Sequence, residues 1–157
     1  MRTGKFTPGD FDLAVRRSQA GLGLFAKAAI PKGACVIEYV GVPLTPEQVE
    51  ASNSRYLFEI TSRKTIDGAP RWNRARYINH SCRPNCEIEI SRGRVFICAR
   101  RNIKPGEELG YDYGKDYFEI YINGGCRCPK CRPNAAPPGV KSTIRLKKRR
   151  AAKGIGQ

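Results

Sequence analysis

The apolar residues of this chain stand in short runs that glycine, proline and charged residues interrupt, and this pattern constrains the fold most. Runs of five or six residues occupy 35–40, 56–60 and 95–99. Runs of this length between turn residues are typical of β-strands. No apolar run approaches the ~18 residues that a membrane-spanning helix needs. We therefore expect a mainly β protein of several small sheets with few short helices, and no membrane partner.

Two further patterns predict where the chain turns and where it is helical. Residues 86–90 alternate in polarity, and Ser91-Arg92-Gly93 before the next apolar run predicts a hairpin turn. Helical turns are expected only at 46–51 and 72–77. The first of these has Thr45 as a suitable N-cap and a proline in its first turn.

Positive charge is the main feature of the composition. The chain has 157 residues, the size of one domain with its own core, and a formal net charge of +15, which invites an anionic partner. Residues 134–157 hold seven lysines and arginines without an acidic residue and begin with a proline-containing linker. We expect this tail to be disordered without a partner. It is either a solvated tail or an arm that binds nucleic acid or an acidic surface.

The seven cysteines favour a metal site over disulfides. The N-terminal residues lack the apolar centre of a signal peptide, so we expect an intracellular, reducing environment. Cys126, Cys128 and Cys131 crowd into a polar stretch, and three thiolates need one further ligand for a closed tetrahedral zinc site. Cys35 and Cys98 stand in apolar runs and suit free core thiols.

Three other segments have the residue types of a functional site. Gly21-Leu22-Gly23 allows close approach to a ligand, but without a long following helix a plain glycine-rich turn is favoured. The only histidine, His80, suits a hydrogen-bonded core role, while the amide of Asn79 suits reading the edge of a heterocycle. Tyr111 and Tyr113 share one side if extended, as pocket walls or as a cross-strand aromatic cluster.

Taken together and in this order, these segments resemble those of the SET-domain lysine methyltransferases. The resemblance covers about residues 12–131 and is carried by Gly21-Leu22-Gly23, Tyr39-Val40-Gly41, Tyr56-Leu57-Phe58, Ile66-Asp67-Gly68, 79–85, 106–114 and the cysteine cluster. It implies small curved sheets, with the C-terminal segment passing beneath a preceding loop as a pseudoknot. It also implies a lead at 1–11, a SET domain at 12–121, a post-SET-like cysteine cluster at 122–133 and the basic tail at 134–157.

The resemblance implies an enzyme that transfers the sulfonium methyl group of S-adenosylmethionine to the ε-amine of a protein lysine. Tyr113 resembles the catalytic tyrosine of the family, and Tyr39 resembles a second phenol of the same pocket. Tyr111 stands where the family has phenylalanine or tyrosine. Because its extra hydroxyl leaves less room for added methyl groups, mono- or dimethylation is expected. A dry site beside a cationic sulfonium favours the neutral, reactive amine.

Cofactor contacts are a further implication of the resemblance. They are expected from Gly21, Leu22, Gly23, Tyr56, Arg76, Asn79 and His80, with the main chain prominent at Gly23 and His80. For Arg76 the alternative is a surface salt bridge.

Zinc is implied in the same way. Its expected ligands are Cys82, Cys126, Cys128 and Cys131, and Cys86 competes with Cys82 for the fourth place. The cluster departs from the usual family pattern, because only two residues separate its last two cysteines and no aromatic residue follows them.

The expected substrate is a basic protein such as a histone or histone-like protein, with its lysine-bearing segment extended beside a strand. A tail that binds nucleic acid would hold the enzyme near such proteins. The alternative function is a non-catalytic, zinc-stabilised nucleic-acid-binding module of the same fold. The intact Asn79 segment and Tyr113 speak against this alternative.

Overall fold

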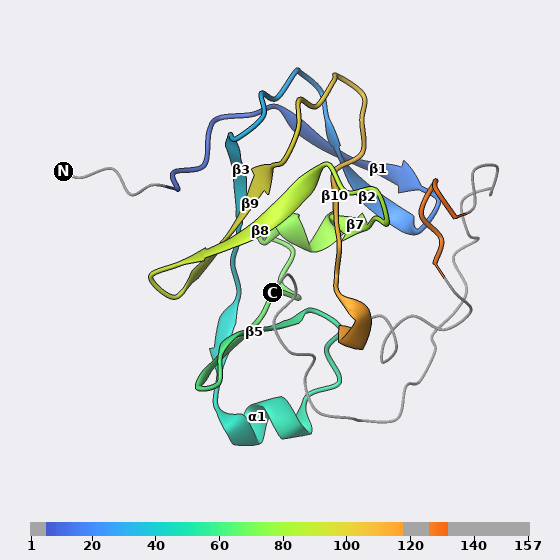
Figure 1. Ribbon diagram of the computed structural model, residues 1–157. Helices are drawn as coiled ribbons and strands as arrows, with labels where there is room; N and C mark the ends of the chain where they lie inside the picture. Colours follow the sequence, from blue (N-terminus) through green and yellow to red (C-terminus); the bar gives the residue numbers. More distant parts are fainter. Residues whose placement is uncertain (1–5, 118–125, 132–157) are drawn as a thin grey trace.

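The computed structural model describes residues 6–117 and 126–131, and this part of the chain is mainly β (Figure 1). The strands have two to six residues, as the short apolar runs predict. The elements are, in order, β1 (Leu13–Ser18), β2 (Gly21–Ala26), β3 (Cys35–Tyr39), β4 (Val42–Leu44), α1 (Pro46–Ala51), β5 (Leu57–Thr61), β6 (Lys64–Asp67), the 3-10 helix η1 (Arg74–Tyr77), β7 (Asn79–His80), β8 (Cys86–Ser91), β9 (Arg94–Ala99) and β10 (Gly110–Tyr111). Within these ranges no helix has the length and apolar character to cross a membrane.

The strands form four small sheets. Strands β1 and β2 form an antiparallel hairpin, β3, β9 and β8 form a three-stranded sheet in that order, and β4, β6 and β5 form another. The fourth is the parallel pair of β7 and β10. In Figure 1, α1 and β5 lie at the opposite end of the molecule from the β1–β2 hairpin. The expected mainly β architecture is confirmed. The expected tail at 134–157 lies outside the described residues, and the four expected segment boundaries stay predictions.

The predicted hairpin turn and first helix both form. Arg92 and Gly93, between β8 and β9, have φ angles of 51° and 70°, the positive values that a tight hairpin turn requires. Helix α1 begins after Thr45, whose side chain accepts a hydrogen bond from the Gln48 amide at 3.2 Å. In return the Gln48 side chain accepts one from the Thr45 amide at 2.8 Å. This capping box, with a proline in the first turn, fixes the helix start where the sequence predicts it.

Two other segments differ from expectation. Residues 21–23 form the start of strand β2 and not a glycine-rich turn. A Cβ on Gly23 would lie 2.4 Å from Oε1 of Glu108, so a larger residue here would displace this side chain, which accepts a hydrogen bond from Asn79. Of residues 72–77, only η1 is helical. The Asn73 side chain does not cap η1, since its Oδ1 accepts from the Val40 amide at 3.3 Å.

An irregularity in β3 determines which of its side chains face the core. Cys35 pairs with Cys98 of β9, whereas Ile37 pairs with Ile97, so β3 has one extra residue between these pairs. A bulge of this kind shifts the alternation of side chains along the strand. As a result Cys35 lies in a small cluster with Cys98, while Tyr39, four residues later, lies in the main core.

The parallel pair of β7 and β10 joins segments that are far apart in the chain. Asn85, which is 4% exposed, holds the two segments together through hydrogen bonds at both ends of its side-chain amide. Its Nδ2 donates to the Glu108 carbonyl at 2.8 Å, and its Oδ1 accepts from the Gly110 amide at 2.9 Å. The segment that ends in β10 is therefore held against the segment that contains β7, a contact that the implied pseudoknot requires.

Replacing Asn85 tests this support. Asn85→Ala leaves the Glu108 carbonyl and the Gly110 amide without partners, so we expect the free energy of unfolding to fall by roughly 2–4 kcal/mol. Chemical denaturation measures the change. Asn102→Ala is the matched control, because Asn102 accepts one exposed hydrogen bond, from the Lys32 amide at 2.8 Å. An equal loss in both variants would contradict the role of Asn85.

Candidate active site

Three of the predicted site residues are phenols that gather where β3 and β10 end. Tyr39 is 5% exposed and Tyr111 is 2% exposed. The ring centroids of Tyr111 and Tyr113 are 4.8 Å apart, and the ring of Tyr39 lies 5.4 Å from that of Phe58. Tyr39 and Tyr111 belong to the same buried core cluster, and Tyr113 packs against it. The sequence prediction that Tyr111 and Tyr113 lie on one side is confirmed.

Backbone carbonyls orient two of these phenols. The Tyr39 hydroxyl donates to the Tyr56 carbonyl at 2.9 Å, and the Tyr113 hydroxyl donates to the Ile78 carbonyl. Burial raises the pKa of Tyr39, Tyr111 and Tyr113 above that of an ordinary tyrosine. The phenols are therefore neutral at physiological pH and act as hydrogen-bonding groups rather than as bases.

Tyr117 belongs to the same cluster, and the sequence analysis missed it. Its ring stands edge-on to that of Tyr113, with centroids 4.9 Å apart and planes at 86°. Its hydroxyl donates to the Arg55 carbonyl at 2.7 Å. Residues 115–117 are helical. The spacing of four residues from Tyr113 was therefore the available signal, because it brings two side chains to one side of a helical turn.

Arg76 and Tyr56 form a stack beside the phenols. The Arg76 guanidinium lies 4.4 Å from the Tyr56 ring centroid and 5.2 Å from that of Tyr77. In the described part of the chain Arg76 makes no salt bridge, so the surface alternative has no support there. Its Nε is buried without a hydrogen-bond partner among the same residues. This unmet donor is a place for an anionic ligand group.

Asn79 connects three parts of the fold through one amide nitrogen. Its Nδ2 lies 2.8 Å from the Leu22 carbonyl, 2.8 Å from Oε1 of Glu108 and 3.1 Å from Oγ of Ser18. These acceptors occupy the amide donors, which the sequence analysis had considered for reading a heterocycle. Asn79 thus fixes β2, with its Gly21-Leu22-Gly23 segment, against β7 and the loop before β10.

His80 lies between the phenols and the cysteine cluster. Its Nδ1 accepts a hydrogen bond from the Tyr113 amide at 3.2 Å, and its Nε2 lies 3.3 Å from Sγ of Cys82. The pKa of His80 is lowered, because the effect of burial is larger than the opposing effect of the Asp112 carboxylate. A neutral imidazole suits both contacts, because it accepts at Nδ1 and donates at Nε2. This arrangement agrees with the hydrogen-bonded role that the sequence favoured.

The four predicted zinc ligands come together. The Sγ atoms of Cys82, Cys126, Cys128 and Cys131 lie within 4.8 Å of one another. Sγ of Cys82 is 3.6 Å from that of Cys126 and 3.7 Å from that of Cys131. Tetrahedral zinc with Zn–S bonds of ~2.3 Å places its sulfurs about 3.8 Å apart, so the cluster fits this metal.

The thiols of the cluster differ in their electrostatics: burial raises the pKa of Cys82 and Cys126, whereas the pKa of Cys128 is lowered. Burial opposes ionisation of Cys128, but hydrogen bonds from the Cys82 and Cys131 backbone lower the pKa of its thiol to about 6. A thiolate at neutral pH is the form that binds zinc. The competitor Cys86 is 1% exposed and lies in β8 opposite Ala99, outside this group. The geometry therefore favours Cys82 over Cys86.

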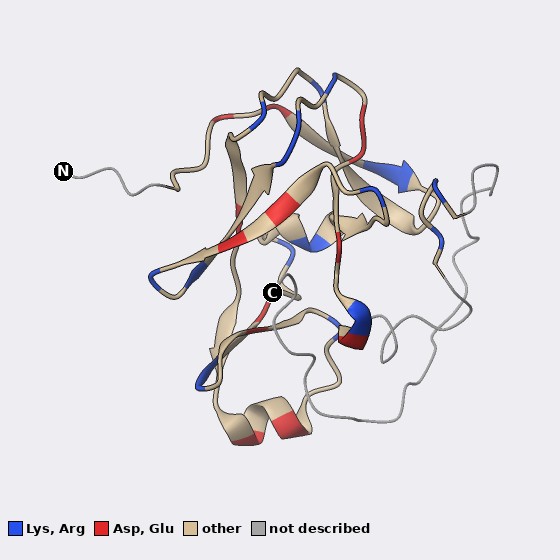
Figure 2. Cartoon of the chain, in the orientation of Figure 1, with Lys and Arg blue, Asp and Glu red and all other residues tan. Residues whose placement is uncertain are grey.

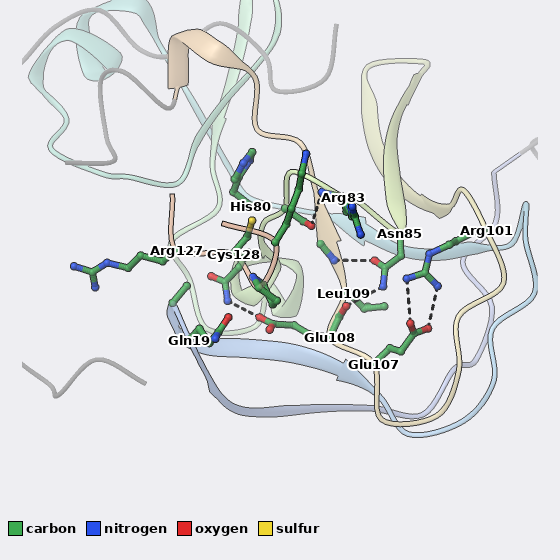
Figure 3. A pocket seen from close by; sticks show the side chains of 16 residues that line it. Gln19, His80, Arg83, Asn85, Arg101, Glu107, Glu108, Leu109, Arg127 and Cys128 are labelled. Carbon is green, nitrogen blue, oxygen red and sulfur yellow. Dashed lines mark hydrogen bonds and ion pairs between the residues drawn. The ribbon is translucent and has the colours of Figure 1, made fainter. Parts of the chain in front are cut away.

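A cavity of about 380 Å³ lies between β7 and the cysteine cluster (Figure 3). Of the predicted site residues, Asn79, His80 and Cys128 line it. Gly21, Leu22 and Gly23 do not, although Gln19 and Ala20 in the turn before them do. Figure 3 shows Arg83 and Arg101 on the side of Asn85 and Arg127 beyond Cys128. The cavity and the phenol cluster are thus neighbours that share the Asn79–His80 strand.

The sequence is similar to those of known proteins. The profile of the SET domain matches residues 21–114. The chain is 39% identical over 126 residues to the histone-lysine N-methyltransferase trr of Drosophila melanogaster, which covers 71% of this chain and 5% of that protein. It is 36% identical over 120 residues to histone-lysine N-methyltransferase 2D of Homo sapiens, covering 69% and 2%. The match to histone-lysine N-methyltransferase set1 of Dictyostelium discoideum is 34% over 123 residues, covering 70% and 8%.

The chain therefore spans less than a tenth of the length of these relatives. The matched region includes β2, the β7–β10 pair and the three phenols that form the cluster. It also covers more than half of this chain, and the fold of small sheets agrees with the match. This chain belongs to the SET-domain family.

Proposed function

We propose that this chain is an S-adenosylmethionine-dependent protein-lysine N-methyltransferase. The observation that carries the proposal is the pair of phenols Tyr39 and Tyr113. Their hydroxyl groups donate to backbone carbonyls, and Tyr113 does so to the residue just before the Asn79–His80 strand. The relatives named as histone-lysine N-methyltransferases support the same reaction class. The three phenols Tyr39, Tyr111 and Tyr113 are the proposed catalytic residues.

The residues around β7 fit the cofactor. When bound, S-adenosylmethionine supplies an electrophilic methyl group on a positively charged sulfur. The buried, unpartnered Nε of Arg76 suits a carboxylate such as that of the methionine part. The cavity at Asn79 and His80 suits the adenosine, which the main chain there would bind. The proposed set is completed by Tyr56, on which Arg76 stacks, and by the main chain of Gly21, Leu22 and Gly23.

The phenols suit a lysine amine as the nucleophile. A lysine with an ordinary pKa of about 10.4 is protonated at neutral pH and has no lone pair with which to attack. The buried cluster excludes water, which disfavours the ammonium form. Because Tyr39 and Tyr113 donate their hydroxyl protons to carbonyls, their oxygens present lone pairs that accept from the amine N–H groups. The chain thus dries and orients the amine, and no strong base is required.

Tyr113→Phe tests the reaction. The change removes the hydroxyl but keeps the ring, so we expect kcat on labelled S-adenosylmethionine and mixed histones to fall by roughly 100-fold. Calorimetry on the same variant should show unchanged uptake of S-adenosylmethionine, because the phenol is not among the proposed cofactor contacts. No transfer by the zinc-loaded wild-type protein to any basic protein would instead favour a non-catalytic binding module.

The hydroxyl of Tyr111 supports a proposal for the methylation state. Tyr111 is 2% exposed, and within the described ranges no hydrogen bond of its hydroxyl occurs. This hydroxyl is therefore free to hold the amine or a water molecule in the pocket and to take the space of a further methyl group. We accordingly expect mono- or dimethylated lysine as the product.

Tyr111→Phe tests the product. Removing the hydroxyl makes room, so we expect the variant to add at least one methyl group more than the wild type does to the same peptide. Mass spectrometry of the product peptide gives the distribution of methylation states. Efficient trimethylation by the wild-type protein would contradict the proposed role of Tyr111.

Zinc on the four-cysteine cluster would hold residues 126–131 beside the cavity. Its removal by a chelator should therefore abolish most of the activity and the order of this segment together. Metal analysis assigns the ligands: we expect about one zinc per chain in the wild type and in Cys86→Ala, and a loss in Cys82→Ala. Full zinc content in Cys82→Ala with none in Cys86→Ala would reverse the assignment.

The proposed substrate is a histone or histone-like protein whose lysine-bearing segment is extended. Strand β5 is at the edge of its sheet and begins one residue after Tyr56, which is next to the phenols. An extended peptide along such an edge would place one lysine toward the cluster. Contact of the basic tail with nucleic acid stays a prediction, since residues 134–157 lie outside the described ranges.

A further inference from the structure

The sheet of β3, β9 and β8 carries two thiols that neither the proposed reaction nor the zinc cluster uses. Cys35 is 8% exposed and Cys98 is 4% exposed. They form a small cluster with Phe96, separate from the main core. Phe6 packs against this cluster, and its ring lies 5.7 Å from that of Phe96. The two thiols are thus one side chain away from solvent.

The backbone sets the two cysteines opposite each other in the pairing that a disulfide needs. Cys35 of β3 and Cys98 of β9 are direct cross-strand partners. The Ala99 amide donates to the Ala34 carbonyl at 2.8 Å, which joins the residue after Cys98 to the residue before Cys35. They therefore form a non-hydrogen-bonded pair, in which Cα atoms are about 4.5 Å apart. Disulfides span Cα separations of about 4.4–6.8 Å.

The two side chains already interact. Each thiol shifts the pKa of the other, because Cys98 lowers the pKa of Cys35 and Cys35 raises that of Cys98. Of the neighbouring charges, Glu38 raises the pKa of Cys35, and Arg94, which forms an ion pair with Glu38, lowers it to a smaller extent. Cys35 is also the more exposed of the two. It is therefore the sulfur that reacts first.

We propose that Cys35 and Cys98 are a reversible redox pair that closes to a cross-strand disulfide on meeting a small-molecule disulfide such as oxidised glutathione. The Cys35 thiolate attacks one sulfur of the small disulfide and expels one thiolate, which leaves a mixed disulfide on Cys35. The Cys98 sulfur then attacks the Cys35 sulfur and expels the second thiolate. Two protein thiols are oxidised, the small disulfide is reduced to two thiols, and these take up the two protons.

The surroundings make this pair slow to oxidise in a reducing environment. Burial raises the pKa of Cys35. Burial first, then the neighbouring Cys35 thiol, and last Glu89 and Glu87 of β8 raise the pKa of Cys98 to about 12. Glu87 lies opposite Cys98 and Glu89 lies opposite Phe96 in the β8–β9 pair, and Figure 2 shows acidic residues along β8. Because only the thiolate attacks, the rate of closure should rise by roughly tenfold per pH unit below the pKa of Cys35.

Cys86 is the internal control for the proposal. It is 1% exposed, and burial raises its pKa to about 12, so it matches Cys98 in both respects. It differs in lying opposite Ala99, with no thiol across the strand. Burial and a raised pKa alone should therefore leave it reduced.

The test uses the full, zinc-loaded chain, whose metal protects the other four thiols. After incubation with oxidised glutathione, free thiols are alkylated in denaturant and the chain is digested with trypsin. We expect a linked pair of peptides, 33–55 with 95–100, that dithiothreitol separates, while Cys86 remains fully alkylated. Separate glutathione adducts on Cys35 and Cys98, or oxidation of Cys86 at the same rate, would overturn the proposal.

Single variants give an independent readout. In Cys35→Ala we expect oxidised glutathione to remove the free thiol of Cys98 at least tenfold more slowly than in the wild type. In Cys86→Ala the linked peptides should still form. An unchanged rate of thiol loss at Cys98 without Cys35 would count against the pair. If Cys35→Ala does not fold, peptide mapping of the wild type decides the question alone.

Discussion

The parallel pairing of β7 with β10 is the contact on which the proposed site depends. It places Asn79 and His80 beside Gly110 and Tyr111, so that residues from the middle and the end of the described chain share one short ladder. With only two residues in each strand, this ladder is too short to hold by itself. The Asn85 amide and the Asn79 amide supply the rest, since they bind the backbone or side chain of Glu108 from two directions.

The same ladder connects the phenols with the cysteine cluster. His80 accepts from the Tyr113 amide on one side and meets Sγ of Cys82 on the other. A metal that fixes Cys82 therefore also limits where His80, and with it the backbone of Tyr113, can lie. In the proposed enzyme, zinc would thus contribute to catalysis by positioning, because its cluster touches the histidine that holds the catalytic tyrosine.

Sequence patterns predicted the parts of the fold that local chemistry decides. The capping box at Thr45 and the turn at Arg92 depend on neighbours in the chain, and both were predicted. The strand at Gly23 was missed because the space beside Gly23 is taken by the side chain of Glu108, a residue distant in the sequence that no local pattern reveals. For the site, the order of motifs and the family resemblance named the phenols and the four thiols. Tyr117 was missed because its importance lies in a tertiary contact with Tyr113.

The bulge in β3 allows one strand to serve two kinds of chemistry. In a regular strand Cys35 and Tyr39, four residues apart, would point to the same face. The extra residue between the Cys35 and Ile37 pairings sends the thiol to the small cluster under Phe6 and the phenol into the main core. A thiol on the Tyr39 face would lie in the main core, without the cross-strand partner that Cys98 provides. The bulge thus separates the thiol pair from the core that contains the phenols, while it directs Tyr39 toward that core.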